Sequence, residues 1–146
     1  MNQSDPNLAL FYEGPYYMYS NFAAFAVRWK RVVCMTSEHH YQAEKFLDIG
    51  IKSEIWCAPS AHDAKKIAQA YASEVRPDWD DEEKLGVMEE IVRAKHAQHP
   101  YIQRKLKETK GLILVEDSPV DPFWGRGPDW KGLNHLALIW MKIRDE

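Results

Sequence analysis

Hydrophobic and polar residues recur along the chain in patterns that predict mostly helices and a few short strands. A helix beginning at Thr36 or Ser37 is indicated first. Either hydroxyl can cap its first turn, and residues 38–45 contain no glycine or proline to interrupt it. At helical spacing this segment has two unlike faces. One face is mostly apolar, is expected to turn toward a core, and comprises His39, Ala43, Phe46 and Leu47.

The second face of this helix is polar. It carries a carboxylate, a phenol, an amide and an ammonium, from Glu38, Tyr41, Gln42 and Lys45. Two interpretations are open, namely an ordinary solvated face and the wall of a binding site. From this segment alone, the solvated face is favoured, since mixed polar faces are common on surface helices.

The remaining periodic segments give the fold class. Strands are predicted over residues 8–12, 25–29, 32–35 and 112–116, the middle two as a hairpin with Lys30 and Arg31 at its tip. Helices are predicted over residues 49–56, 61–72, about 80–96, 101–109 and 133–144. Ser60 is a candidate cap for the helix from residue 61, and Asp78 or Asp80 for the long helix after it. The apolar stripe of that long helix is expected to comprise Leu85, Met88, Ile91, Val92 and the aliphatic stem of Lys95. Strands do not alternate with helices, and no glycine-rich nucleotide motif is present. The expected fold is therefore mainly α, with orthogonal helices and a few short β-strands, in one compact domain over residues 9–146 after a loose tail of residues 1–8.

Chain length, net charge and cysteine content limit the ligands and the compartment that we expect. The chain has 146 residues, enough for one domain with a real core, and a net charge of −3. Without a general basic field, binding to long nucleic acid by charge alone is not expected, while a local basic pocket for a phosphate stays possible. Two cysteines make no disulfide framework, and neither a secretory leader nor a bilayer-length apolar segment is seen. We therefore expect a cytoplasmic protein with no membrane partner and an unknown oligomeric state.

Metal and cysteine chemistry are weakly supported. His39, His40 and Glu44 fall within about one helical turn and could supply two ligands, but no motif completes a metal site. Neither Cys34 nor Cys57 has a catalytic motif around it. No metal, other cofactor or cysteine nucleophile is predicted.

Aromatic residues in loops suggest another chemistry. Trp79, Trp124 and Trp130 lie beside acidic residues in loops that contain proline or glycine. Such an indole either plugs the core or forms a platform on which a base stacks, and both alternatives are open. A carboxylate nearby could steady a ribosyl cation or activate water, and a second acid could protonate the departing base. Cleavage of a sugar–base bond is therefore feasible.

Several segments, taken in order, resemble the YbiA-like family, also called the NADAR family. The resemblance covers about residues 11–144. Its two most specific parts are the Glu-His-x-x-Gln helix and the Asp-x-x-Trp-Gly-x-Gly loop. The matching segments are Tyr19–Phe22, Thr36–Lys45, Ala64–Lys66, Trp79, Lys95, Asp121–Gly127 and Trp130–Asn134.

The resemblance implies a mainly helical fold and N-glycosidase activity on ribosyl C–N bonds. One branch of the family is associated with phosphoribosylamino-pyrimidine intermediates of riboflavin synthesis. Another is associated with ADP-ribose, including its removal from guanine bases in nucleic acid. The implied partner is a small ribosyl or nucleotide substrate, or ADP-ribosylated nucleic acid. The implied catalytic residues are Glu38, Trp79 and Asp121. The implied substrate-binding residues are Tyr19, Ser20, Asn21, Tyr41, Gln42, Lys45, Lys65, Trp124, Gly125, Arg126 and Asn134.

One departure from the family leaves the branch open. Many members follow the Ala-Lys pair with Gly-Arg, whereas this chain has Ala68-Gln69 there, so an arginine that could hold a phosphate is absent. Lys65, Arg28 and Arg126 are the candidate substitutes.

The roles of the two carboxylates are also open. Glu38 is expected to polarise water or stabilise the ribosyl cation, and Asp121 to assist proton transfer or hold a ribose hydroxyl, with the two roles interchangeable. Trp79 or Trp124 would stack on the base. A module that binds ADP-ribose or a nucleotide without cleaving it is the alternative function. A purely structural role is third, and it predicts tryptophan rings fully buried by the core.

Overall fold

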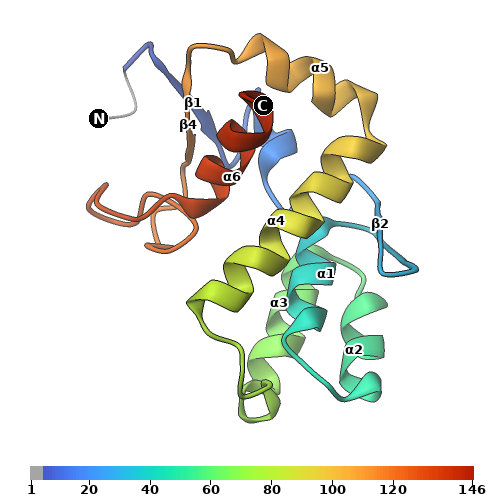
Figure 1. The fold of residues 1–146 in the computed structure, drawn as a ribbon. Helices are drawn as coiled ribbons and strands as arrows, with labels where there is room; N and C mark the ends of the chain where they lie inside the picture. The colour runs from blue at the N-terminus through green and yellow to red at the C-terminus, as the bar shows by residue number, and fades with distance from the viewer. Residues whose placement is uncertain (1–4) are drawn as a thin grey trace. The chain divides into compact units, whose positions relative to one another are not determined.

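A computed structural model describes residues 5–146, and within them it contains six α-helices, two 3-10 helices and four short strands (Figure 1). This confirms the mainly helical fold class. Residues 1–4 of the predicted tail lie outside the described part. The elements are β1 Leu8–Phe11, η1 Tyr17–Tyr19, β2 Val27–Trp29, β3 Val32–Cys34, α1 Ser37–Glu44, α2 Ile49–Trp56, α3 Ala61–Ala70, η2 Ala72–Glu74, α4 Asp81–Gln98, α5 Pro100–Glu108, β4 Ile113–Glu116 and α6 His135–Arg144.

The described residues form two compact units. One unit combines the two ends of the chain, up to Ser20 and from His99 onward, and the other runs from Asn21 to Gln98. None of the helices in the described residues is long and apolar enough to cross a membrane.

The first unit is built around a parallel strand pair. β1 and β4 pair in register from Leu8 opposite Ile113 to Phe11 opposite Glu116. α6 packs on β4, and its Trp140 is completely buried and donates an indole hydrogen bond of 3.0 Å to the Tyr19 carbonyl. The predicted strands and the closing helix are thus confirmed. The parallel pairing joins two segments that lie about one hundred residues apart in the sequence.

The second unit begins with the predicted hairpin. β2 and β3 pair antiparallel, with Trp29 opposite Val32. Lys30 and Arg31 form the two-residue turn and have φ values of +49° and +67°. Both central residues of a type I′ turn need positive φ, and this turn matches the twist of the strands. The hairpin leads directly into α1, whose first turn is capped by the Thr36 hydroxyl accepting from the His39 N–H.

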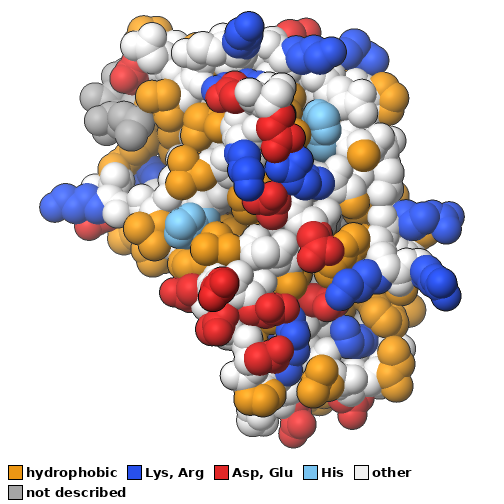
Figure 2. Space-filling view, viewed as in Figure 1, with side chains coloured by type: hydrophobic (Ala, Val, Ile, Leu, Met, Phe, Trp, Pro, Cys, Tyr) orange, Lys and Arg blue, Asp and Glu red, His pale blue; other side chains and the backbone are white. Residues whose placement is uncertain are grey.

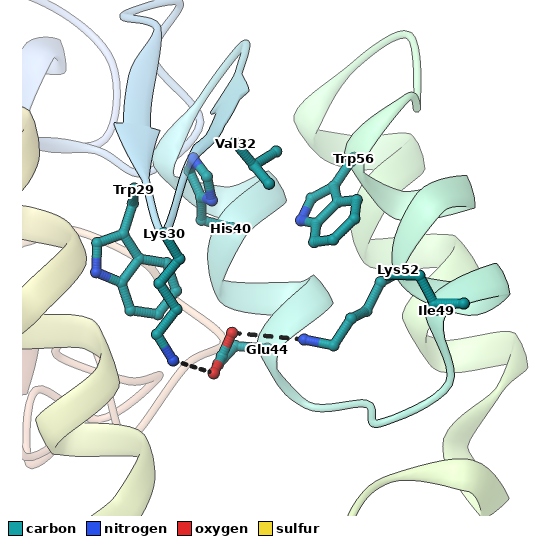
Figure 3. A pocket seen from close by; sticks show the side chains of 8 residues that line it. All are labelled: Trp29, Lys30, Val32, His40, Glu44, Ile49, Lys52 and Trp56. Carbon is teal, nitrogen blue, oxygen red and sulfur yellow. Dashed lines mark hydrogen bonds and ion pairs between the residues drawn. The ribbon is translucent and has the colours of Figure 1, made fainter.

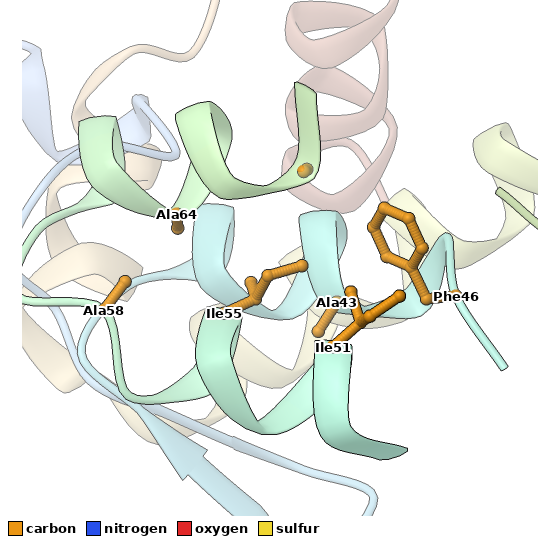
Figure 4. Packing of buried hydrophobic residues seen from close by; sticks show 7 residues of the cluster. Ala43, Phe46, Ile51, Ile55, Ala58 and Ala64 are labelled. Atoms are coloured by element: carbon orange, nitrogen blue, oxygen red, sulfur yellow. The ribbon is translucent and has the colours of Figure 1, made fainter. Parts of the chain in front are cut away.

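Three short helices enclose the core of this unit. α1 packs against α2 and α3, and several contact positions are alanines that let the helix backbones approach closely (Figure 4). The cluster consists of Ala43, Phe46, Ile51, Ile55, Ala58, Ala64 and Ala68. The prediction that Leu47 joins this core is wrong, because it is 74% exposed. α1 ends at Glu44, so Leu47 no longer follows the helical repeat.

The long helix α4 completes the second unit. The Asp80 carboxylate caps it by accepting from the Glu83 N–H at 2.8 Å. Its buried stripe includes Met88, Ile91 and Val92 as predicted, but Val87 is buried where Leu85 was expected. Lys95 was expected to bury only its aliphatic stem, yet the whole side chain is buried.

Charged side chains of both signs are interspersed on the face shown in Figure 2. Acidic side chains gather around the start of α4, where Asp78, Asp80, Asp81 and Glu82 are exposed. This surface provides no broad basic field.

Candidate active site

The polar face of α1 is buried. Glu38 is 6% exposed and Gln42 is 4% exposed, so the interpretation as a solvated face is wrong. The two side chains lie one turn apart, and the Gln42 Nε2 donates a hydrogen bond of 2.8 Å to the Glu38 Oε1. The backbone N–H of Glu38 donates to the Asn21 carbonyl at 3.1 Å. Because Glu38 is in the first turn, the positive end of the helix also favours its ionised form.

The carbonyl oxygen of the Gln42 amide is available to a ligand. Its Oε1 is buried and accepts no hydrogen bond from the residues that the structure describes. Leaving a buried carbonyl unsatisfied costs on the order of 1–3 kcal/mol. The orientation follows from the partner, because a carboxylate accepts and only the Nε2 can donate to it. A hydroxyl or N–H of a bound ligand would satisfy this oxygen.

Aromatic and cationic side chains form a layer beside this pair. The rings of Tyr41 and Trp79 are 5.6 Å apart and tilted by 54°. The Arg76 guanidinium lies 4.9 Å from the Trp79 ring centre, and the Lys45 ammonium lies 5.2 Å from that of Tyr41. Trp79 is half-buried, so it is not sealed into the core. It can therefore present ring surface to a planar group.

The segment before Trp79 is fastened to the end of α1. The Arg76 N–H donates to the Lys45 carbonyl at 2.8 Å, and Phe46 and Val75 form an isolated β-bridge. The Arg76 guanidinium also pairs with Asp78 and Glu83. These contacts hold the indole against Tyr41, although residues 75–80 contain no regular element.

Asn21 secures the beginning of α1. Its side chain is buried, with the Oδ1 accepting from the Ser37 hydroxyl at 2.9 Å and the Nδ2 donating to the Met88 sulfur at 3.3 Å. We therefore interpret Asn21 as a residue that positions Glu38.

Tyr19 and Ser20 belong to the first unit, and both are buried. The Tyr19 ring packs between Phe11 and Trp140, and burial raises the pKa of its hydroxyl. That hydroxyl has no hydrogen-bond partner among residues 5–146. Tyr19 is therefore part of the core of its unit.

A second group of predicted site residues lies in the loop between β4 and α6. The Asp121 Oδ1 accepts from the N–H groups of Phe123 and Trp124, both at 2.9 Å. This carboxylate therefore holds the turn that presents Trp124. The Trp124 ring is half-buried and packs edge-on against Phe123, with 4.7 Å between centres.

The same loop covers the start of α6. The first N–H groups of a helix have no partner within it. Here the carbonyls of Phe123, Trp124 and Gly125 accept from His135, Leu136 and Asn134 at 3.1–3.2 Å. The loop conformation is thus set by the helix that follows it.

Three further predicted residues shape this loop. A Cβ at Gly125 would lie 3.0 Å from the Glu116 carbonyl oxygen, so the backbone passes there only because the residue is glycine. Asn134 bridges to β4, donating to the Leu114 carbonyl and accepting from the Glu116 N–H. The Arg126 guanidinium pairs with Asp117 at 2.7 Å, donates to the Gly127 carbonyl and lies over Trp130. These contacts engage the Arg126 side chain within the loop, although it was one candidate to replace the missing phosphate-binding arginine.

The other two phosphate candidates, unlike Arg126, lie in the second unit. Lys65 is half-buried on α3. Arg28 is exposed on β2, where its backbone pairs with the Gln98 side chain. The predicted site therefore falls into two groups. Glu38, Tyr41, Gln42, Lys45 and Trp79 come together in one unit, and Asp121, Trp124, Gly125, Arg126 and Asn134 come together in the other.

The histidines considered as metal ligands have other partners. The His39 ring bonds to the Thr36 hydroxyl at 2.7 Å and the Ala58 carbonyl at 3.0 Å. The His40 Nε2 donates to the Val27 carbonyl at 2.7 Å, and burial lowers the pKa of this ring. Both rings tie α1 to its neighbours.

Lys95, which the sequence matched to the family but did not assign to the site, is a buried titratable group in the second unit. Its ammonium lies 5.6 Å from the Phe25 ring centre, and burial lowers its pKa from 10.5 to about 7. Burial away from water disfavours the charged form of an amine. Its spacing after Met88, Ile91 and Val92 places it on the buried stripe of α4, but spacing alone does not predict that its ammonium is buried.

Comparisons with known proteins identify the family of this chain. A family model described as the NADAR domain matches residues 10–146. The N-glycosidase Npun_R5314 of Nostoc punctiforme is 36% identical over 135 residues, covering 90% of this chain and 86% of that protein. The N-glycosidase YbiA of Escherichia coli K12 is 34% identical over 128 residues, covering 88% of this chain and 79% of that protein.

A longer relative and a solved structure are also similar to this chain. The chloroplastic riboflavin biosynthesis protein PYRR of Zea mays is 36% identical over 121 residues, which cover 76% of this chain but 19% of that longer protein. The NMR structure of the E. coli protein YbiA is 34% identical, with a TM-score of 0.86 over 94% of this chain and 83% of that one. The chain therefore belongs to the NADAR domain family.

Proposed function

We propose that this chain is an N-glycosidase that hydrolyses a ribosyl C–N bond, with Glu38 as its central carboxylate. The observation that carries the proposal is the buried Glu38, held by the Gln42 amide beside the Tyr41–Trp79 ring pair. The relatives from Nostoc punctiforme and E. coli are named N-glycosidases. The chain is accordingly a hydrolase of N-glycosyl bonds, acting on a small ribosyl compound.

The proposed reaction uses the fixed negative charge of Glu38. As the C–N bond breaks, its electrons leave with the base, and the anomeric carbon becomes an oxocarbenium-like cation that the carboxylate stabilises. Water then attacks that carbon, and its proton passes to a carboxylate and finally to the departing base. A positioned acid–base group typically contributes about 10²–10⁴-fold to rate.

The neighbouring groups orient the substrate in this proposal. The unsatisfied Gln42 Oε1 accepts from a ribose hydroxyl or an N–H of the base. Trp79 stacks on the base, which in nucleic-acid complexes contributes about 1–3 kcal/mol. Asp121 uses one carboxylate oxygen for the turn at Trp124, and its part in the reaction stays a prediction from the family resemblance.

For the substrate, we favour a phosphoribosylamino-pyrimidine over ADP-ribosylated guanine in nucleic acid. The relative from Zea mays is named a riboflavin biosynthesis protein. The net charge of −3 supplies no general attraction to a polyanion. ADP-ribosylated guanine remains the second candidate, on the family resemblance.

Incubation with each substrate in heavy-oxygen water, followed by mass spectrometry, tests the proposal. We expect free aminopyrimidine and a ribose phosphate that carries one heavy oxygen. Release from ADP-ribosylated guanine alone would make the chain a nucleic-acid de-modification enzyme. Saturable binding with no product from either substrate would reject catalysis and support the binding module.

A further inference from the structure

A pocket of about 270 Å³ lies on α1 opposite the Glu38–Gln42 face, entirely within residues 21–98 (Figure 3). Glu38 and Gln42 share one side of the helix, whereas His40 and Glu44 point to the other. The hairpin and α2 supply the remaining walls. The residues that matter to the argument are Trp29, Lys30, His40, Glu44, Lys52 and Trp56.

Two indoles flank this pocket. Figure 3 shows Trp29, from β2, and Trp56, from α2, on opposite sides of the open space, with His40 between them. The His40 ring packs edge-on against Trp29, with 5.7 Å between centres. The His40 Nε2 donates its hydrogen bond to the Val27 carbonyl, and burial lowers the pKa of the ring. His40 therefore gives the pocket a neutral surface. These walls suit a planar aromatic group.

The charges at the mouth of the pocket leave one positive charge in excess. The Lys30 ammonium pairs with Glu44 Oε1 at 2.8 Å, and the Lys52 ammonium lies 3.6 Å from Glu44 Oε2. Each ammonium also lies near an indole, 4.7 Å from the centre of Trp29 and 5.8 Å from that of Trp56. A cationic ligand would meet two ammonium groups and a carboxylate already paired through both oxygens. An anionic ligand would instead meet two ammonium groups that share one carboxylate.

The backbone that carries Lys30 is strained. Both residues of the hairpin turn have left-handed φ values, although neither is Gly, Asn or Asp. The left-handed conformation costs most L-residues roughly 1–2 kcal/mol each. Such strain persists where surrounding contacts enforce it, and it is common at ligand sites. Here the turn places the Lys30 ammonium so that it pairs with the Glu44 carboxylate and also lies over the Trp29 ring.

We propose that this pocket binds a small planar aromatic anion, with its rings against Trp29 and Trp56 and its acidic group on Lys30 and Lys52. The volume is slightly below the range of about 300–1,000 Å³ that is usual for ligand pockets, so one or two fused rings fit better than a dinucleotide. The inference is independent of the N-glycosidase proposal, because it uses none of the side chains assigned to that reaction.

A series of naphthalene compounds tests both the site and the sign of the charge. Naphthalene-2-carboxylate, its neutral carboxamide and the matching cationic methylammonium compound share one ring system. Titration of each is followed through the indole N–H resonances in NMR spectra, assigned with Trp29→Phe and Trp56→Phe. We expect the carboxylate to shift both resonances saturably and to bind at least about tenfold more tightly than the carboxamide, with the cation weakest. Absence of a saturable shift, or a carboxamide or cation that binds as well as the carboxylate, overturns the proposal.

Two further measurements isolate the lysines. Lys52→Met should reduce carboxylate binding to the level of the carboxamide and leave carboxamide binding unchanged, while the exposed Lys66→Met serves as the matched control. Raising salt from about 50 mM to about 0.5 M should weaken only the carboxylate, which tests the charge in the unaltered protein. A carboxylate preference that survives both changes would contradict the assignment.

Discussion

In the proposed reaction, Glu38 supplies a negative charge and Trp79 supplies a ring surface on which the base stacks. Glu38 is fixed by its hydrogen bond from Gln42, and Trp79 is held against Tyr41 by the segment tied to the end of α1. Because the indole is half-buried, part of its surface is open to a substrate and it is not only a core residue.

Removing this indole should weaken binding more than chemistry. Trp79→Ala is expected to raise the Kd for the substrate by about 5- to 150-fold, the equivalent of about 1–3 kcal/mol of stacking. Trp79→Phe should lose less, because a smaller ring remains. Calorimetric titration in the Glu38→Gln background measures binding without turnover, and Tyr101→Ala removes an exposed ring on α5 as the control. An unchanged Kd in Trp79→Ala would remove the stacking role.

Lys95 predicts a pH dependence of stability. Burial lowers its pKa from 10.5 in the unfolded chain to about 7 in the folded protein. Between these values the unfolded chain binds a proton that the folded protein lacks, so the free energy of unfolding rises with pH.

Lys95→Met should remove this dependence. Over about pH 7–9, the wild-type free energy of unfolding should rise relative to that of Lys95→Met by up to about 1.4 kcal/mol per pH unit. Urea unfolding at several pH values measures the difference, and Lys66→Met should follow the wild type. Parallel curves for wild type and Lys95→Met would show that the buried lysine keeps an ordinary pKa.

At the residue scale, the sequence identified side chains better than it identified their surroundings. Spacing placed Glu38 and Gln42 on one face, but their burial depends on residues distant in the sequence, such as Asn21. The contacts of Asn134 and Arg126 were not predictable for the same reason, because they depend on how the loop meets β4 and α6. Lys95 was assigned to the apolar stripe from its spacing, yet burial of its ammonium does not follow from spacing.

Among the elements, α1 serves three purposes on three faces. His39 and Ala43 are buried against neighbouring elements. Glu38 and Gln42 form the candidate site, and His40 and Glu44 line the pocket between the hairpin and α2. An isolated helix of eight residues is marginal in water. Tertiary contacts therefore hold α1, which ties both ligand-facing sides to the core of the second unit.

Two glycine substitutions test the packing of elements in opposite directions. A Cβ at Gly132 would overlap the Gly125 carbonyl and the Arg126 backbone, so Gly132→Ala should displace the loop and lower Tm.

Gly86 lies inside α4 with nothing within 4 Å of a new Cβ. Gly86→Ala should therefore stabilise the helix by about 0.5–1 kcal/mol and raise Tm by about 1–4 °C. Thermal unfolding measures both, and a Gly132→Ala variant as stable as wild type would contradict the tight loop packing.

Local signals predicted the elements well where they were strong. The caps at Thr36, Ser60 and Asp80 occur at hydroxyl and carboxylate side chains that were candidates in the sequence. The hairpin occurs where β-branched and aromatic residues predicted its two strands. The pairing of β1 with β4 was not predicted, because a parallel pair between distant segments leaves no local pattern.

For the whole molecule, the expectation of a single domain remains a prediction. Contacts divide the described chain into two units, while the family model extends over residues 10–146 and so includes parts of both. We expect one cooperative thermal transition, with the calorimetric enthalpy equal to the van't Hoff enthalpy. Two separate transitions, or near-UV and far-UV signals that change at different temperatures, would show that the units unfold independently.

The most direct test of the whole account compares single-turnover hydrolysis of a phosphoribosylamino-pyrimidine by wild type and Glu38→Gln. The glutamine can still accept the hydrogen bond from Gln42, so folding and substrate binding should be retained. We expect the rate to fall by about 10²–10⁴-fold with little change in Kd or Tm, whereas the exposed Glu90→Gln on α4 should turn over like wild type. Full activity in a folded Glu38→Gln protein would contradict the central role assigned to this carboxylate.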